Sequence, residues 1–245
     1  MIAAIKSEFR KLYTIRSTYV IVGLSLALVA LLTFWVEGIK NASAVSQDPN
    51  RLASEIVNAV QIVSLILPFV GLLLVTHEYR YNTIMHTLTS SNSRTKTLFA
   101  KILAIGLFSI IFGMILAVLG PVFTYIATHF FKGMDFVHQE FVWSSILWRC
   151  VFCAWGYGMI GLLLAVLVRN QVAAIAAFLV IPMTIEPLLS LLLKSNAIYL
   201  PFSSLGAVTA KGSISYAHAA AVFMIYMVVG WAIAWVLFLR RDATN

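Results

Sequence analysis

The chain has 245 residues, of which 61% are hydrophobic and only 11% are charged. A soluble domain carries about 25% charged residues, so this composition excludes a single water-soluble core and indicates a protein whose solvent is lipid. The formal net charge of +8 is typical of Lys and Arg gathered on cytoplasmic loops. Nucleic-acid binding is not expected, because the chain lacks a basic patch with interleaved aromatic residues.

Residues 1–16 are predicted to form an interfacial amphipathic helix. Apolar residues recur on one helical face at spacings of three, four and three: Ile2, Ile5, Phe9 and Leu12. Four basic residues accompany them: Lys6, Arg10, Lys11 and Arg16. Such a helix lies at the membrane surface with its apolar face in the acyl boundary. A plain cytoplasmic tail is the alternative, and the regular spacing favours the helix.

Six apolar segments are long enough to cross a bilayer. The predicted spans cover approximately residues 18–36, 56–76, 100–122, 150–168, 172–193 and 219–239. The third apolar segment exceeds one span, so Pro121 is interpreted as a kink or as the outer end. Polar loops are expected at 37–55, 132–149 and 194–218, and the apolar middle of the last, YLPFSSLGAV, could re-enter the membrane. The predicted fold class is an all-α integral membrane protein with a single transmembrane domain over 1–245.

An even number of spans places both termini on one side of the membrane. Alternating the loops gives that side 11 of the Lys and Arg residues and the opposite side 6. Because cytoplasmic loops carry the excess of Lys and Arg, the termini and residues 77–101 are predicted to be cytoplasmic.

Small residues form a seam on the fourth predicted span. They follow a spacing of four, three and four: Ala154, Gly158, Gly161 and Ala165. Small residues let membrane helices approach closely, so tight helix packing is expected here rather than ligand binding. Cys150 and Cys153 have CxxC spacing but no further Cys and no nearby His, and they are interpreted as small apolar residues.

Glu186 lies inside the fifth apolar segment, next to Pro187 and four residues after Pro182. A carboxylate within a membrane span is costly and indicates a function by default. One hypothesis is that Glu186 lines a substrate path or holds a cationic group. The other is that it caps a broken helix near the outer interface, where the prolines leave backbone groups in need of partners.

Motifs of hydrolytic and nucleotide chemistry are missing from the sequence. No Walker A loop, HExxH, GxSxG or metal-spaced Cys/His cluster occurs. The chain is therefore not expected to be an enzyme by itself, and it has no predicted catalytic residue, metal site or cofactor of its own.

The longest polar passage between two spans is 76–101, THEYRYNTIMHTLTSSNSRTKTLFAK, and it is predicted to be a docking surface for a cytoplasmic partner. The order of a basic amphipathic helix, two spans, a long cytoplasmic passage and four spans resembles the ABC-2 type transporter permeases. Their passage often reads Glu, a basic residue, Gly-Thr, a Leu pair, Pro, Ser-Arg and Lys. This sequence offers Glu78, Arg80, Thr83, Leu88, Ser93, Arg94 and Lys101 and departs at Asn82 and Ser91. YLPF at 199–202 also resembles the re-entrant outer region of these permeases.

The resemblance implies a coupling helix over 78–95 that rests on a cytoplasmic ABC ATPase dimer, which would bind ATP and Mg. The implied ATPase-coupling residues are Glu78, Tyr79, Arg80, Thr83, Leu88, Ser93 and Arg94. It also implies a second permease subunit, the same or a related chain, in the lipid of a bacterial cell membrane. The substrate would be a drug, an antimicrobial peptide or a lipid-like molecule, and the short outer loops resemble the antibiotic or bacteriocin export and immunity branch most.

Two other functions stay open. One is an ATP-independent secondary transporter or channel that uses Glu186, although the inverted repeats and multiple intramembrane charges typical of such carriers are missing. The other is a membrane sensor subunit without transport.

Overall fold

The computed structural model describes residues 2–37, 49–81, 93–132, 142–209 and 214–240, and all regular structure within them is helical. In chain order the helices are α1 (Ile2–Thr14), α2 (Arg16–Leu31), α4 (Pro49–Ser64), α5 (Leu67–Arg80), α7 (Arg94–Lys132), α8 (Trp143–Val168), α9 (Gln171–Val180), α10 (Glu186–Leu193), α11 (Pro201–Ala207) and α12 (Tyr216–Arg240). Short π-helical stretches extend α2 (Leu32–Glu37) and join α9 to α10 (Ile181–Ile185), and a 3-10 helix (Lys194–Tyr199) precedes α11.

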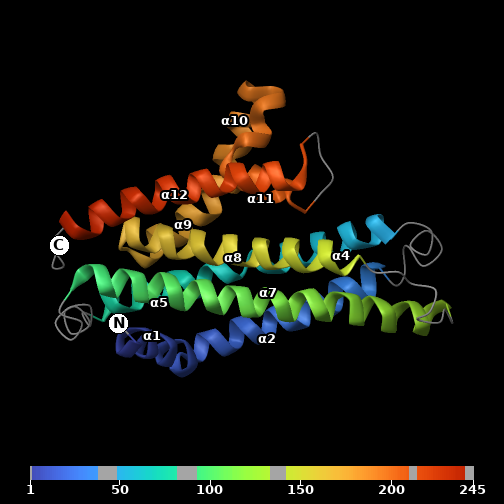
Figure 1. Ribbon diagram of the computed structural model, residues 1–245, viewed down its shortest axis with the longest axis horizontal. Helices are drawn as coiled ribbons and strands as arrows, with labels where there is room; N and C mark the ends of the chain where they lie inside the picture. The colour runs from blue at the N-terminus through green and yellow to red at the C-terminus, as the bar shows by residue number, and fades with distance from the viewer. Residues whose placement is uncertain (1, 38–48, 82–92, 133–141, 210–213, 241–245) are drawn as a thin grey trace.

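Six of the described helical stretches are long and apolar enough to cross a membrane: Arg16–Phe34, Leu52–Arg80, Arg94–Ala127, Trp143–Val168, Gln171–Tyr199 and Tyr216–Arg240. The chain is therefore an all-α integral membrane protein, as the apolar segments predicted. Helix α1 and the end of α12 lie at the same end of the bundle (Figure 1). We call this the terminal end; α5 finishes, α7 begins and α8 turns into α9 there.

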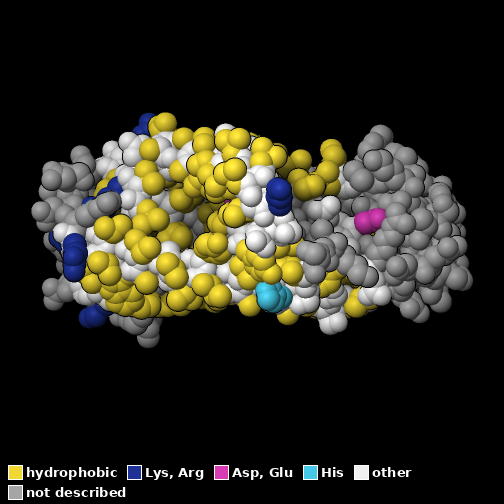
Figure 2. All heavy atoms as spheres, turned by 90° about the horizontal axis from the view of Figure 1, so that it is seen from above, with side chains coloured by type: hydrophobic (Ala, Val, Ile, Leu, Met, Phe, Trp, Pro, Cys, Tyr) yellow, Lys and Arg dark blue, Asp and Glu magenta, His cyan; other side chains and the backbone are white. Residues whose placement is uncertain are grey.

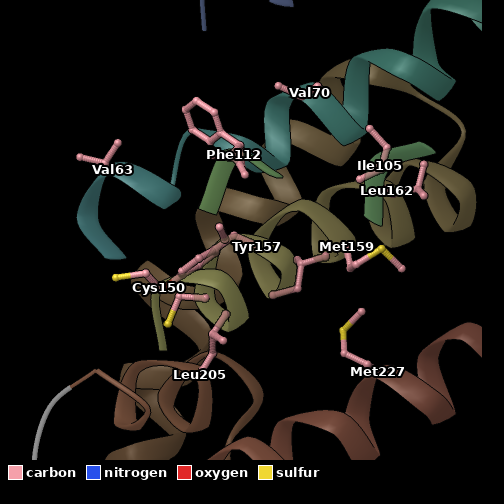
Figure 3. Packing of buried hydrophobic residues seen from close by; sticks show 14 of the residues in the cluster. Val63, Val70, Ile105, Phe112, Cys150, Tyr157, Met159, Leu162, Leu205 and Met227 are labelled. Carbon is pink, nitrogen blue, oxygen red and sulfur yellow. The ribbon is translucent and has the colours of Figure 1, made fainter. Parts of the chain in front are cut away.

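The centre of the bundle is α8, which contacts α4, α5, α7, α9 and α12. Figure 3 shows core side chains converging on α8 from α5, α7, α11 and α12, among them Val70, Ile105, Phe112, Leu205 and Met227. The small-residue seam makes this approach possible. A methyl group added at Gly161 would lie 2.1 Å from the Pro68 carbonyl oxygen, and one added at Gly158 would lie 2.1 Å from Ser109 Oγ. The seam therefore packs against α5 and α7 of the same chain.

Three spans remain largely uncovered. Only 22% of the apolar window of the first span, 17% of the fifth and 22% of the sixth are buried inside the molecule. In Figure 1, α10 projects away from the other helices. Figure 2 shows hydrophobic side chains over most of the described face, with most of its Lys and Arg at one end. Lipid or another membrane chain must cover this surface.

Several helices extend beyond the predicted spans into the expected loops. Pro121 lies inside the continuous helix α7, which loses one backbone hydrogen bond there but does not end. The helix α4 already begins at Pro49, and α8 begins at Trp143, which puts Arg149 within a helix. The expected loop at 194–218 contains α11.

Candidate functional site

The polar passage 76–101 is shared between two long helices. Glu78, Tyr79 and Arg80 form the last turn of α5, and α7 begins at Arg94. The prediction of one coupling helix over 78–95 is therefore corrected at both ends. Residues 82–92, which include Thr83 and Leu88, lie outside the described residues.

A cluster of four charged side chains joins three helices at the base of this passage. Lys101 Nζ of α7 lies 2.8 Å from Glu78 Oε1 of α5 and 3.0 Å from Glu8 Oε2 of α1. Lys11 Nζ lies 2.6 Å from Glu8 Oε1 and also contacts Glu78 Oε1. Lys101, Glu8 and Glu78 are 1%, 2% and 4% exposed. Two cations and two anions thus form an electrically neutral ion cluster, in which Lys101, Glu8 and Glu78 are buried and Lys11 is half-buried.

Because most of the ion cluster is buried, the stability of the protein depends on its equal numbers of positive and negative charges. Removing one partner of a buried pair costs about 3–5 kcal/mol, because it leaves an uncompensated charge in a medium of low polarity. Lys11 lies on α1, outside the spans. Burial acts to lower its pKa, but attraction from Glu78 and Glu8 outweighs burial and raises the pKa above its ordinary value. Lys11 therefore stays charged and holds α1 against α5.

Glu8 was not predicted from the sequence, although a signal was present. It lies three residues after Ile5 and four before Leu12, on the apolar face of the amphipathic helix. An acid on that face has to be buried, and a buried acid needs a cation. The structure supplies Lys101, which is 93 residues away in the chain.

The other described residues of the predicted coupling set are placed as follows. Tyr79 is half-buried beneath Arg169, whose guanidinium carbon lies 5.6 Å from the ring centroid. Arg80 is exposed. The Ser93 carbonyl accepts a hydrogen bond from Thr97 N at the start of α7. Arg94 Nη1 donates to the Leu239 carbonyl at 3.3 Å, at the last turn of α12.

Glu186 is 5% exposed and accepts hydrogen bonds from the neighbouring helix α11. Its Oε1 accepts from Phe202 N at 2.7 Å, and its Oε2 accepts from Ser203 N at 2.9 Å and Ser203 Oγ at 2.8 Å. These backbone N–H groups belong to the first turn of α11, where no partner exists within the helix. Glu186 therefore caps α11 rather than its own broken span, and its lone pairs are used inside the protein.

A second buried cation was missed in the sequence because it lay in an expected loop. Arg149 of α8 is 1% exposed and donates from Nε to the Val208 carbonyl at 2.8 Å and from Nη2 to the Thr209 carbonyl. Its guanidinium carbon lies 4.0 Å from the centroid of the Tyr216 ring. These contacts fix the end of α11 and the start of α12 to α8, far from the ion cluster.

Comparison with known proteins agrees with this architecture. No curated protein matches the chain. A family model described as ABC-2 family transporter protein matches residues 4–185, from α1 to the π-helical stretch before α10. The match includes all four residues of the ion cluster and both helices that flank the polar passage. The chain therefore belongs to the ABC-2 family of transporter proteins and is a transport permease of the membrane.

Proposed function

We propose that this permease is the membrane subunit of an ATP-driven exporter and that residues 82–92 dock a separate cytoplasmic ABC ATPase. A second permease subunit, identical or related, would complete the assembly in a bacterial cell membrane, with the termini of this chain in the cytoplasm. ATP and Mg would be bound by the ATPase dimer. The polar sequence of 82–92 and the family to which the chain belongs support this role.

The observation that carries the proposal is the ion pair between Glu78 and Lys101. It joins the two helices that bracket residues 82–92, and Glu8 adds α1 to the same contact. A push on 82–92 would therefore move the second span, the third span and α1 together. Rigid movement of packed helices is a common way in which ligand-driven closure at one end opens a path elsewhere.

In this proposal, some of the predicted coupling residues hold the helices together and others contact the ATPase. Glu78 is buried in the ion cluster, so it acts as a positioning residue for the passage and not as a contact for the ATPase. Arg94 is engaged with the end of α12. Direct contact with the ATPase is proposed for 82–92, with Leu88 as an apolar anchor and Thr83 as a polar contact.

The proposed substrate is a drug, an antimicrobial peptide or a lipid-like molecule, carried between the two permeases. The broad apolar surface of the first, fifth and sixth spans supports a path bounded by a second membrane chain. ATP-independent transport through Glu186 is less well supported, because that carboxylate already accepts three hydrogen bonds from α11.

Co-purification tests this function. The chain is co-expressed with candidate ABC ATPases, and the amount of ATPase retained on the purified permease is measured. L88S is expected to reduce the retained ATPase several-fold, whereas L239S, at an exposed leucine of the terminal end, is expected to leave it unchanged. If replacing 83–91 by Gly and Ser leaves both ATPase retention and ATP-driven transport intact, the docking proposal is wrong.

A further inference from the structure

An open cavity of about 430 Å³ lies at the terminal end, between the end of α5 and the turn from α8 to α9. Its described lining residues are Thr76, Tyr79, Arg80, Arg169, Asn170, Gln171 and Val172. The volume falls within the range of about 300–1,000 Å³ that is usual for small-molecule sites. None of these lining residues belongs to the ion cluster.

The charge of the cavity selects an anion. Arg80 and Arg169 both line it, and none of the described lining residues is acidic. The Arg80 guanidinium carbon lies 5.8 Å from the centroid of the Tyr81 ring. Arg80 forms no ion pair with any residue that the structure describes. The cavity also lies at the N-terminal end of α9, whose dipole favours negative charge. Two guanidinium groups beside a helix N-terminus suit a phosphate group well.

The backbone at Arg169 indicates that its side chain matters. Arg169 ends α8 with φ 56°, a left-handed conformation that favours glycine or asparagine. An arginine held there, with its guanidinium over the rings of Tyr79 and Phe238, is directed into a fixed position. A residue kept at a conformational cost is a reason to look for a function at that side chain.

The surroundings favour a lipid as the source of the phosphate. The cavity lies where the second and fourth spans end and the fifth span begins. From its rim, one face of the fifth span stays exposed and apolar over nearly three turns: Val172 is 77% exposed, Leu179 41%, Val180 46% and Met183 75%. Acyl chains attached to a phosphate in the cavity would lie along this face.

We propose that the cavity between α5 and the α8–α9 turn binds the phosphodiester headgroup of an anionic phospholipid through Arg80 and Arg169. Basic pockets between the ends of membrane helices are suited to such headgroups. The bound lipid would fix the terminal end of the fifth span against α5, close to the polar passage. The site does not depend on the identity of the exported substrate or on docking of the ATPase.

Native mass spectrometry of the purified full-length chain tests this site. Phosphatidylglycerol and phosphatidylcholine are added in turn, and the bound lipid is counted. The wild-type chain is expected to retain phosphatidylglycerol in preference to phosphatidylcholine, and R80Q/R169Q is expected to weaken that binding at least tenfold. R240Q is the matched control, because Arg240 is exposed at the same end but does not line the cavity. Equal binding by R80Q/R169Q and R240Q would overturn the proposal.

Two further measurements distinguish loss of the lipid site from misfolding of the variant and from binding of a soluble anion. V172E keeps both arginines and alters a side chain that is 77% exposed, and its carboxylate at the rim should repel the phosphate and reduce phosphatidylglycerol binding. Undiminished binding by a folded V172E chain contradicts the site. Glycerol phosphate is then added as a water-soluble competitor. If glycerol phosphate displaces the lipid at equal concentration, the cavity is a site for soluble phosphates instead. If R80Q/R169Q loses ATPase co-purification but keeps the lipid, the two arginines form a protein contact instead.

Discussion

Lys101 Nζ lies 2.8 Å from Glu78 Oε1, although 23 residues separate them and the polar segment 82–92 lies between them in the chain. Both side chains are buried, and Glu8 and Lys11 of α1 complete a neutral group around them. An ion pair therefore joins the two helices that flank this segment, and it also anchors the N-terminal helix α1. This contact links the part of the chain proposed to meet an ATPase to the spans that would move.

Neutralising the pair should be tolerated better than neutralising one member. K101M leaves two carboxylates with one lysine, and a loss of about 3–5 kcal/mol is expected from the uncompensated charge. E78Q/K101M leaves Glu8 paired with Lys11, so its thermal unfolding temperature in detergent should lie above that of K101M. A double variant less stable than K101M by the full cost of E78Q would mean that the two charges act independently.

Gly161 should tolerate no side chain. A methyl group there meets the Pro68 carbonyl oxygen at 2.1 Å and the Pro68 Cα at 2.4 Å, and this backbone cannot move without displacing α5. G161A is expected to destabilise the protein by about 1–3 kcal/mol or more through overpacking. G23A is the matched control, because nothing lies within 4 Å of a methyl group at Gly23. Equal unfolding temperatures for the two variants would contradict the packing described for the seam.

Substitution of Glu186 should affect stability before it affects transport. E186Q presents one carbonyl oxygen where the carboxylate accepts three hydrogen bonds, so a loss of about 1–3 kcal/mol is expected. S203A removes one of these hydrogen bonds and should cost less. Transport per folded molecule should stay near the wild-type rate in both. An E186Q chain of wild-type stability that fails to transport would favour the substrate-path hypothesis.

The contribution of Lys11 should persist to alkaline pH. Its pKa is raised in the folded protein, so the stability it adds is fully present below the unfolded value, about 10.4, and is lost as the pH rises through the higher folded pKa. The difference in unfolding temperature between wild type and K11M should be constant from about pH 8 to 10 and should shrink above that range. A difference that disappears near neutral pH would contradict the raised pKa.

The number of spans could be predicted from the sequence because it depends on local composition. A run of about 20 apolar residues must cross the membrane whatever it packs against. The amphipathic spacing of Ile5, Phe9 and Leu12 likewise identified α1, in which Leu12 is 3% exposed. The basic and polar passage between the second and third spans was visible for the same reason.

The partners of buried polar groups could not be predicted, because they lie far away in the chain. Glu8 meets Lys101 across 93 residues, and Arg149 meets Val208 across 59. Hydropathy treats Arg149 as a polar interruption and starts the fourth span after it, whereas the helix α8 includes Arg149 and the side chain finds its partners on another element. Glu186 was recognised as unusual, but the helix that it caps is separated from it by 16 residues.

Photo-crosslinking from position 88 tests the central proposal most directly. L88C, labelled with a maleimide benzophenone in the assembled transporter, should form a covalent adduct with the ABC ATPase on illumination. The native thiols of Cys150 and Cys153 are fully buried and should not take up the label. An adduct from L88C, with none from L239C at the end of α12, is the predicted result. An assembled, transport-competent complex in which labelled L88C gives no adduct with the ATPase would contradict the proposal that residues 82–92 form the docking site.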